Sequence, residues 1–237
     1  MGAPEGIGYI GYDDERPQHD VTVPSFYMGK FEITQVQWEA VMGAEKNISY
    51  FKGDNLPVEN VSWIDATEFC QKLSQLTGTT YRLPNEAQWE YACRAGTTGY
   101  YAGKLDDFAW YGDNSGKERI DALKLWNSDF ANYRKLLTDN SNQTHPVGQK
   151  MPNAFGLYDM HGNVWEWCED IWHDSYMGAP TDGSTWISGG DSSRRILRGG
   201  SWDGNSDVCR SALRSLNYPS YRYYSFGFRV VVVARSS

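Results

Sequence analysis

Segments in the N-terminal part of the chain carry apolar side chains at the three- and four-residue spacing of an amphipathic helix. The clearest is residues 62–78, where Ser62 and Asp65 form the pattern of a capping box and Gly78 follows the last turn. The same plan, a capping residue at the start and a glycine just past the end, predicts two further helices: Thr34 to Gly43 and Asn85 to Gly96. The N-terminal part of the chain should therefore contain capped helices.

Short runs of apolar and aromatic residues predict strands around these helices, within residues 25–34, 153–172, 195–202 and 226–234. Helical spacing disappears after residue 96. From Gly99 to Asn153 the chain is polar and rich in Gly, Asn and Asp, which predicts long loops. This order of elements indicates an α+β protein, with one domain over residues 1–237.

The charge balance narrows the range of partners. The 237 residues include 22 Lys and Arg against 30 Asp and Glu, a formal net charge of −8, and no block of basic residues occurs. Nucleic acid and anionic membrane surfaces are therefore not expected partners. The longest apolar run near the C-terminus, VVVVA, is far shorter than the roughly 20 residues of a membrane-spanning helix, so we expect no membrane insertion of this chain.

The cysteines Cys70, Cys93, Cys168 and Cys209 are widely separated and form no CxxC pair. Buried free thiols are favoured over a single disulfide. No GxxxxGK[ST], GxGxxG or HExxH motif is present, so the sequence indicates neither a phosphate-binding loop nor zinc-protease chemistry.

Blocks of sequence that carry most of the predicted elements follow one another in this order: FYMGKFEITQVQWEAVM, PVENVSWIDATEFCQKLS, YRLPNEAQWEYACRAGT, NAFGLYDMHGNVWEW, RILRGGSW and GFRVV. In that order they resemble the formylglycine-generating enzyme (sulfatase-modifying factor) family over roughly residues 20–233. The resemblance implies a C-type-lectin-like fold of the formylglycine-generating subtype, a single compact domain rich in irregular structure with its terminal strands close together. The fold alone does not define a function.

The oxidase chemistry of that family needs a pair of thiols just after the RGGSW block, which bind copper and exchange with a substrate thiol. The matching stretch, DGNSDVCRSALR, holds Cys209 and no second cysteine. A related lineage of sulfoxide synthases has its iron site on an additional helical domain, for which 237 residues leave no room. We therefore expect no enzymatic activity. The alternative, a cysteine oxidase with a displaced thiol, predicts an exposed Cys209 with a lowered pKa.

The C-terminal pattern RILRGGSW…CRSA.R…P..R…GFRVV resembles the variable proteins of diversity-generating retroelements, of the treponeme type. In these proteins, mutation at adenines yields residues such as Tyr, Ser, Gly, Asp and Asn, but not Lys, Glu, Gln, Met or Trp. Residues 203–226 contain none of the latter types. The resemblance implies a variable ligand-binding segment at residues 198–230 with these recognition positions: Asp203, Gly204, Asn205, Asp207, Val208, Leu213, Ser215, Leu216, Asn217, Tyr218, Tyr221, Tyr223, Tyr224, Ser225 and Phe226.

Tyrosine is the most prominent residue of this segment, at Tyr218, Tyr221, Tyr223 and Tyr224. It presents a large surface with few rotatable bonds and a hydroxyl group, as in antibody paratopes. Because Pro, Ser and Arg interleave these tyrosines, we expect them to be exposed, whereas Phe228 should belong to the core. The residues expected to hold the scaffold are Trp202, Arg210, Ala212, Arg214 and Arg229.

The sequence thus predicts a non-catalytic ligand-binding display protein whose Tyr-rich surface is diversified by a retroelement. Its ligand is unidentified, and a protein is favoured over a small molecule because dispersed aromatic residues suit a broad patch. We expect a monomer at the cell surface or outside the cell, held through a signal or lipid anchor outside this chain. Besides the cysteine oxidase, a structural partner subunit is the alternative, and it predicts that the Tyr-rich surface is buried in an oligomer.

The turn LYDMHGNVWEW suggests a structural calcium ion. In formylglycine-generating enzymes the matching turn binds Ca²⁺, and the resemblance implies these ligands, the middle two through main-chain oxygens: Asp159, Gly162, Val164 and Glu166. Hard oxygen ligands of this kind suit calcium. The alternative is that both carboxylates accept hydrogen bonds from turn amides. A second, weaker calcium site would involve Asn132, Tyr133, Asp139 and Ser141. No other cofactor is expected.

Overall fold

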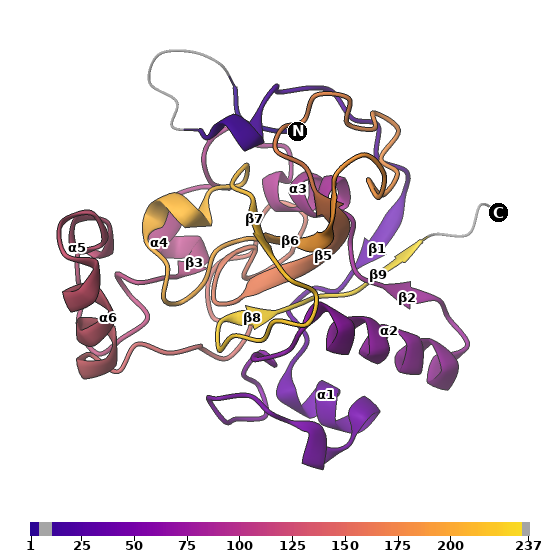
Figure 1. The fold of residues 1–237 in the computed structure, drawn as a ribbon. Coiled ribbons are helices and arrows are strands. Elements are labelled where there is room, and N and C mark those ends of the chain that lie inside the picture. Colours follow the sequence, from indigo (N-terminus) through magenta and orange to yellow (C-terminus); the bar gives the residue numbers. More distant parts are fainter. Residues whose placement is uncertain (5–10, 234–237) are drawn as a thin grey trace.

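Helices α1 (Gln35–Met42), α2 (Trp63–Thr77) and α3 (Glu86–Arg94) form where the capping pattern predicts them in the computed structural model, which describes residues 1–4 and 11–233 (Figure 1). Each begins with a complete capping box, in the pairs Thr34 and Gln37, Ser62 and Asp65, and Asn85 and Gln88. Helix α2 ends at Gly78, whose φ of 71° lies in the left-handed region that favours glycine. These helices are therefore specified locally.

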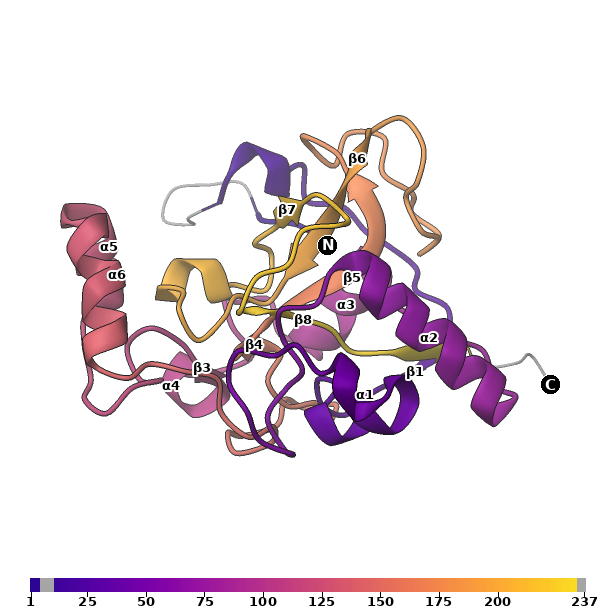
Figure 2. The same cartoon turned by 60° about the horizontal axis from the view of Figure 1, so that its bottom comes forward.

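The prediction of loops throughout residues 99–153 is wrong. The chain there forms α4 (Leu105–Phe108), α5 (Ala122–Ser128) and α6 (Phe130–Asp139). The side chains of Asp121 and Asp129 cap α5 and α6, so the aspartates that suggested loops are helix starts. Helices α5 and α6 lie together at the margin of the molecule in both views (Figures 1 and 2).

The strands form two main sheets. The smaller sheet joins β1 (Phe26–Met28), β9 (Val231–Val233) and β2 (Tyr81–Arg82), with β9 in the middle, so the N- and C-terminal strands pair as expected. The larger sheet has the order β7 (Ser215–Asn217), β6 (Asp191–Arg198), β5 (Trp165–Trp172) and β8 (Phe226–Gly227). A short parallel pair joins β3 (Ala109–Trp110) and β4 (His161–Gly162).

The larger sheet is covered on both faces. Trp167 and Leu197 belong to the cluster that includes the buried residues of α1 and α2. Their neighbours along the same strands, Cys168 and Ile196, belong to the cluster around Trp89 of α3. Successive strand residues point to opposite faces, so β5 and β6 separate two cores.

Arginines of residues 198–230 fasten this segment to distant parts of the chain through buried ion pairs. The pairs are Arg198 with Glu86 and Glu90, Arg210 with Glu15, Arg214 with Glu86, and Arg229 with Glu166. The glutamates come from α3, from β5 and from the N-terminal segment. All of the residues expected to hold the scaffold are buried: Trp202, Arg210, Ala212, Arg214 and Arg229.

Hydrogen bonding compensates for the burial of these charges, which is costly for an unpaired ion. Arg214 donates to both carboxylate oxygens of Glu86 at 2.8 and 3.0 Å, and to the carbonyl oxygens of Asp14 and His173 at 2.7 and 2.8 Å. Burial alone would raise the pKa of Glu90, but Arg198 and Arg94 lower it below its usual value. Glu90 is therefore held as a carboxylate by arginines.

Substitution of Arg214 by methionine should lower the free energy of unfolding by about 3–5 kcal/mol, because it removes the main partner of a buried carboxylate. The matched control is Arg222→Met. Arg222 also forms a two-point ion pair, with Asp65, but 47% of its side chain is exposed, and the expected loss is below about 1 kcal/mol. Urea unfolding of both variants measures the difference. Equal losses would contradict the role assigned to the buried pairs.

Candidate functional site

Nine of the fifteen predicted recognition positions line a hollow of about 390 Å³ at the end of the larger sheet. We call this hollow, with the loop of residues 217–226 beside it, the aromatic hollow. The positions that line it are Asp203, Gly204, Val208, Ser215, Asn217, Tyr221, Tyr223, Ser225 and Phe226. The predicted positions outside its lining are Asn205, Asp207, Leu213, Leu216, Tyr218 and Tyr224. Residues that were chosen from sequence alone are thus brought together by the fold.

The tyrosines of the loop differ in exposure. Tyr218 and Tyr221 are 52% and 45% exposed, as expected. Tyr223 and Tyr224 are half-buried, against expectation, because their rings pack on each other with centroids 4.2 Å apart. Tyr224 also lies against Trp202, with centroids 5.5 Å apart. The expected exposure therefore holds for the outer pair and fails for the inner pair.

Several predicted recognition positions are buried, which corrects the expectation of a wholly exposed set: Asp203, Gly204, Asn205, Leu213, Ser225 and Phe226. Tertiary packing explains this. Phe226 packs edge-on against Trp167 of the core, with centroids 5.4 Å apart. The Asn205 side chain accepts hydrogen bonds from the backbone N–H of Asp207 and Val208 and so caps a short helical turn.

The backbone of the loop is fixed by contacts with α2 and with the segment just before it. The Pro219 carbonyl accepts a hydrogen bond from the Ile64 N–H at 3.2 Å, and the Tyr223 carbonyl accepts one from Asn60 at 3.0 Å. Arg222 donates to both carboxylate oxygens of Asp65 at 2.7 Å. Desolvation would raise the pKa of Asp65, but the hydrogen bonds from Arg222 and Ser62 outweigh it and lower the pKa. The exposed tyrosines thus project from an anchored backbone.

Sequence reasoning missed a wall of the hollow that comes from α5 and α6. Trp126 and Phe130 line it and are 36% and 50% exposed, with ring centroids 4.7 Å apart. Arg134 of α6 also lines it, and its guanidinium carbon lies 5.8 Å from the ring centroid of Tyr223. No sequence signal marked these residues, because the region was read as loops.

Glu166, one of the four implied calcium ligands, already has several hydrogen-bond partners. Both carboxylate oxygens of Glu166 accept from Arg229 at 2.7 Å, and Oε2 also accepts from the Trp89 indole N–H at 2.8 Å. Val164 donates its N–H to Glu32 at 3.0 Å. Glu166 is therefore committed to a guanidinium and does not fit the role of a calcium ligand.

Asp159, another implied ligand, has a carboxylate oxygen without a hydrogen-bond partner among the described residues. Its Oδ2 accepts from the Gly148 N–H at 2.7 Å, its Oδ1 is buried without a hydrogen-bond partner, and burial raises its pKa to about 6. In the described part of the chain, no group of three or more His, Cys, Asp or Glu side chains could hold a metal ion. Calcium binding stays a prediction.

Most residues of the second implied calcium site belong to α6, a helix that the sequence analysis did not predict. Asp139 accepts a hydrogen bond from Lys135, and the Tyr133 hydroxyl is buried and donates to the Asp203 carbonyl at 2.8 Å. Ser141 lies beyond the helix in the left-handed region, with φ 55°. Asp139 and Tyr133 therefore serve the helix and its packing.

All four cysteines are free and buried, as the sequence favoured. Desolvation raises the pKa of the Cys209 thiol far above its usual value, and Cys209 has 0% of its surface exposed. A thiol that attacks a substrate must be accessible and readily ionised. The structure therefore contradicts the exposed, acidic Cys209 that a displaced-thiol oxidase requires.

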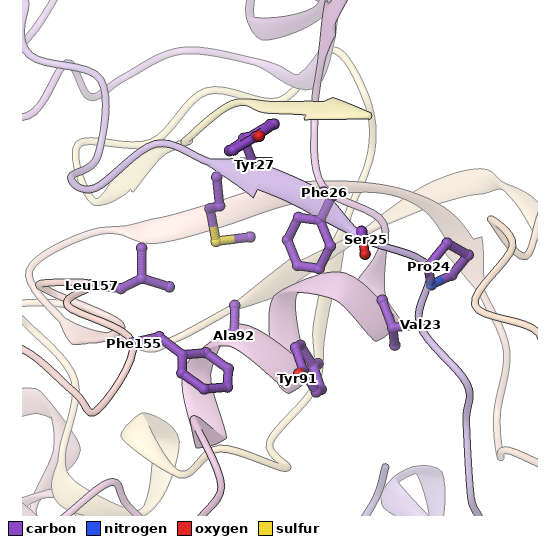
Figure 3. A pocket seen from close by; sticks show the side chains of 10 residues that line it. Val23, Pro24, Ser25, Phe26, Tyr27, Tyr91, Ala92, Phe155 and Leu157 are labelled. Atoms are coloured by element: carbon purple, nitrogen blue, oxygen red, sulfur yellow. The ribbon is translucent and has the colours of Figure 1, made fainter. Parts of the chain in front are cut away.

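A second hollow, of about 410 Å³, lies between β1 and α3 (Figure 3). Phe26, Tyr91 and Phe155 gather in it, and their rings form two contacts with centroids 6.4 and 5.4 Å apart. Tyr27 lies on the other side of the strand in this view. None of the predicted recognition residues lines this hollow.

The two-sided central sheet, the paired terminal strands and the long irregular connections define a C-type-lectin-like fold of the formylglycine-generating subtype, the class that the sequence predicts. Residues 1–234 match the family model of the sulfatase-modifying factor enzyme 1-like domain, and the chain belongs to this family. Among the described residues, no helix is long and apolar enough to cross a membrane.

Relatives of this chain include a protein named as a chaperone and proteins named as enzymes. The chain is 36% identical over 221 residues to the chaperone protein LppX of Paenibacillus barcinonensis, covering 77% of this chain and 71% of that protein. It is 35% identical over 201 residues to the formylglycine-generating enzyme of Streptomyces coelicolor, covering 83% of this chain and 58% of that protein. Membership of the family is therefore compatible with enzymatic and with non-enzymatic roles, and the residues of the site must distinguish between them.

Solved structures support the fold over almost the whole chain. PvdO from Pseudomonas aeruginosa is similar with a TM-score of 0.80 and 31% identity, covering 99% of this chain and 90% of that chain. Variable protein 1 of Treponema denticola is similar with a TM-score of 0.80 and 29% identity, covering 99% of this chain and 92% of that chain. The predicted resemblance to a variable protein of this fold is confirmed at the level of structure.

Burial should make Cys209 unreactive in the folded protein. Iodoacetamide at pH 8 should leave it unmodified in the native chain and alkylate it once the chain is unfolded in guanidinium, as measured by mass spectrometry of its peptide. The unfolded sample is the control for reagent and detection. Alkylation of Cys209 at similar rates in both samples would restore the oxidase as a candidate.

Proposed function

We propose that this chain is a non-catalytic recognition protein and that it binds its ligand at the aromatic hollow. The observation that carries this proposal is the pairing of exposed tyrosines with an anchored backbone. Tyr218 and Tyr221 are about half exposed, while the loop that carries them is fixed to α2 by Arg222 and the Pro219 carbonyl. Such a surface loses little conformational entropy when a ligand binds.

A protein is the ligand class that this surface suits best. Exposed aromatic residues extend beyond the hollow, because Tyr50 is 71% exposed and its ring centroid lies 5.8 Å from that of Tyr224. Large aromatic residues that are partly exposed on a fixed frame commonly dominate protein interfaces. The relative named as a chaperone, 36% identical to this chain, supports a protein-binding role.

We further propose that a retroelement diversifies the surface. The positions that can vary freely are the exposed and half-exposed ones, such as Ser215, Asn217, Tyr218 and Tyr221. Buried positions such as Phe226 tolerate fewer residues, because a smaller side chain there would leave a cavity in the core. The similarity to Treponema denticola variable protein 1 supports this proposal. Display at the cell surface, through a signal or anchor outside this chain, and a monomeric state belong to the same proposal.

The buried Cys209 argues against the cysteine oxidase, and Tyr218 and Tyr221 favour recognition over a purely structural partner subunit. A subunit whose Tyr-rich surface is permanently covered would form an oligomer of defined mass. The recognition proposal instead leaves this surface free in the isolated chain.

Panning of a phage-displayed random-peptide library tests the proposal. Peptides that bind the unchanged chain should lose at least tenfold in affinity for the double variant Tyr218→Ala, Tyr221→Ala, because each aromatic anchor can contribute about 2 kcal/mol. Tyr27→Ala is the matched control, since Tyr27 is 72% exposed but lies on β1. It should retain the same peptides.

Two results would contradict the proposal. One is that no recovered peptide distinguishes the double variant from the unchanged chain. The other is that the Tyr27 control removes binding as strongly as the double variant does, which would place recognition at the smaller sheet. Thermal melting of each variant confirms that the fold is retained.

A further inference from the structure

The interior of the aromatic hollow combines a buried carboxylate with aromatic walls. The side chain of Asp203 is 8% exposed, and its Oδ1 accepts a hydrogen bond from the Ser201 hydroxyl at 2.6 Å. The aromatic residues that line the hollow are Trp126, Phe130, Trp165, Tyr221, Tyr223 and Phe226. Ring faces carry partial negative charge, so both components attract cations.

A guanidinium of the chain itself already lies at this place. Arg134 of α6 has its Nη1 3.5 Å from Asp203 Oδ2, and its guanidinium carbon lies over the rings of Tyr223 and Tyr224, 5.8 and 5.6 Å from their centroids. It also donates a hydrogen bond to the Tyr224 hydroxyl. Arg134 therefore demonstrates that a cationic side chain fits the chemistry of the hollow.

We propose that the aromatic hollow accepts an arginine or lysine side chain of the protein that binds to this surface. The inference rests on the proposed function and assigns the ligand chemistry of the same site. The incoming cation takes over the contacts of Arg134 with Asp203 and with the tyrosine rings, and Arg134 moves toward solvent, where 38% of its side chain already lies.

The contacts of Arg134 make the exchange feasible. Its ion pair with Asp203 is longer than a hydrogen bond at 3.5 Å, so Arg134 compensates the charge of Asp203 only in part. Desolvation raises the pKa of Asp203, in spite of the hydrogen bonds from Ser201 and Ser225 and the charge of Arg134. A closer second cation would stabilise the carboxylate further. An anionic ligand would instead face Asp203 and the ring faces, and would have to separate Arg134 from both.

The net charge of the chain agrees with a basic partner. The chain carries a formal net charge of −8, so long-range attraction favours proteins with basic surfaces. Within the site, the preference for a basic side chain comes from Asp203, which is one of the positions predicted to vary. Replacement of Asp203 in another variant of the protein would then change the charge preference of the site while the walls from α5 and α6 stay the same.

Peptides from the random library described above provide the test, with the chain variants Asp203→Asn and Arg134→Gln. Peptides that depend on Tyr218 and Tyr221 should be enriched in Arg and Lys relative to the input library. Their affinity should fall about tenfold with Asp203→Asn and rise severalfold with Arg134→Gln, which removes the internal competitor. Replacement of the critical basic residue of a synthetic peptide by norleucine should cause a similar loss.

The possible outcomes separate this inference from the function on which it rests. Peptides that depend on the tyrosines but show no basic enrichment, and that bind the Asp203→Asn variant unchanged, would overturn the inference and leave the recognition surface intact. The complete absence of tyrosine-dependent peptides would overturn both. A loss of binding with Arg134→Gln would show that Arg134 contacts the ligand directly, and would also overturn the exchange.

Discussion

The buried arginine–glutamate pairs are the constraint on which the rest of this structure depends. Residues 198–230 contain short strands joined by irregular backbone, and sheet hydrogen bonds alone hold only a small part of this segment. Arg198, Arg210, Arg214 and Arg229 fix it to α3, to β5 and to the N-terminal segment. A buried charge is costly without its partner, so each pair fixes the position of the backbone at its arginine. This position does not depend on which side chains lie between the arginines.

This arrangement explains how one segment can be both framework and recognition surface. The arginines point inward, whereas Tyr218 and Tyr221 are exposed between Arg214 and Arg229. Changes at the exposed positions leave the ion pairs untouched, so specificity can change while the fold is retained. The wall from α5 and α6 adds a part of the surface that lies outside the segment, and the recognition site is therefore a composite of fixed and variable elements.

Local signals in the sequence predicted the parts of the structure that are determined locally. The capping boxes at Ser62 and Asn85 specify α2 and α3, because the interacting groups lie within one turn. The same logic failed for α5 and α6, whose capping aspartates resemble loop residues. Family resemblance identified Arg210, Arg214 and Arg229 as scaffold residues but not their partners. Arg210, for example, pairs with Glu15, which is 195 residues away. The burial of Ser225 and Phe226 likewise depends on packing that no local pattern encodes.

The most direct test of a diversified recognition surface is the DNA sequence beside the gene. The account predicts a reverse transcriptase and a near-identical second copy of the stretch that encodes residues 198–230. This copy should differ at adenines in the codons of exposed positions such as Tyr218 and Tyr221, and should preserve the codons of the buried arginines. A locus with neither the enzyme nor the copy, or a copy that differs equally at Arg214 and Tyr221, would contradict the account.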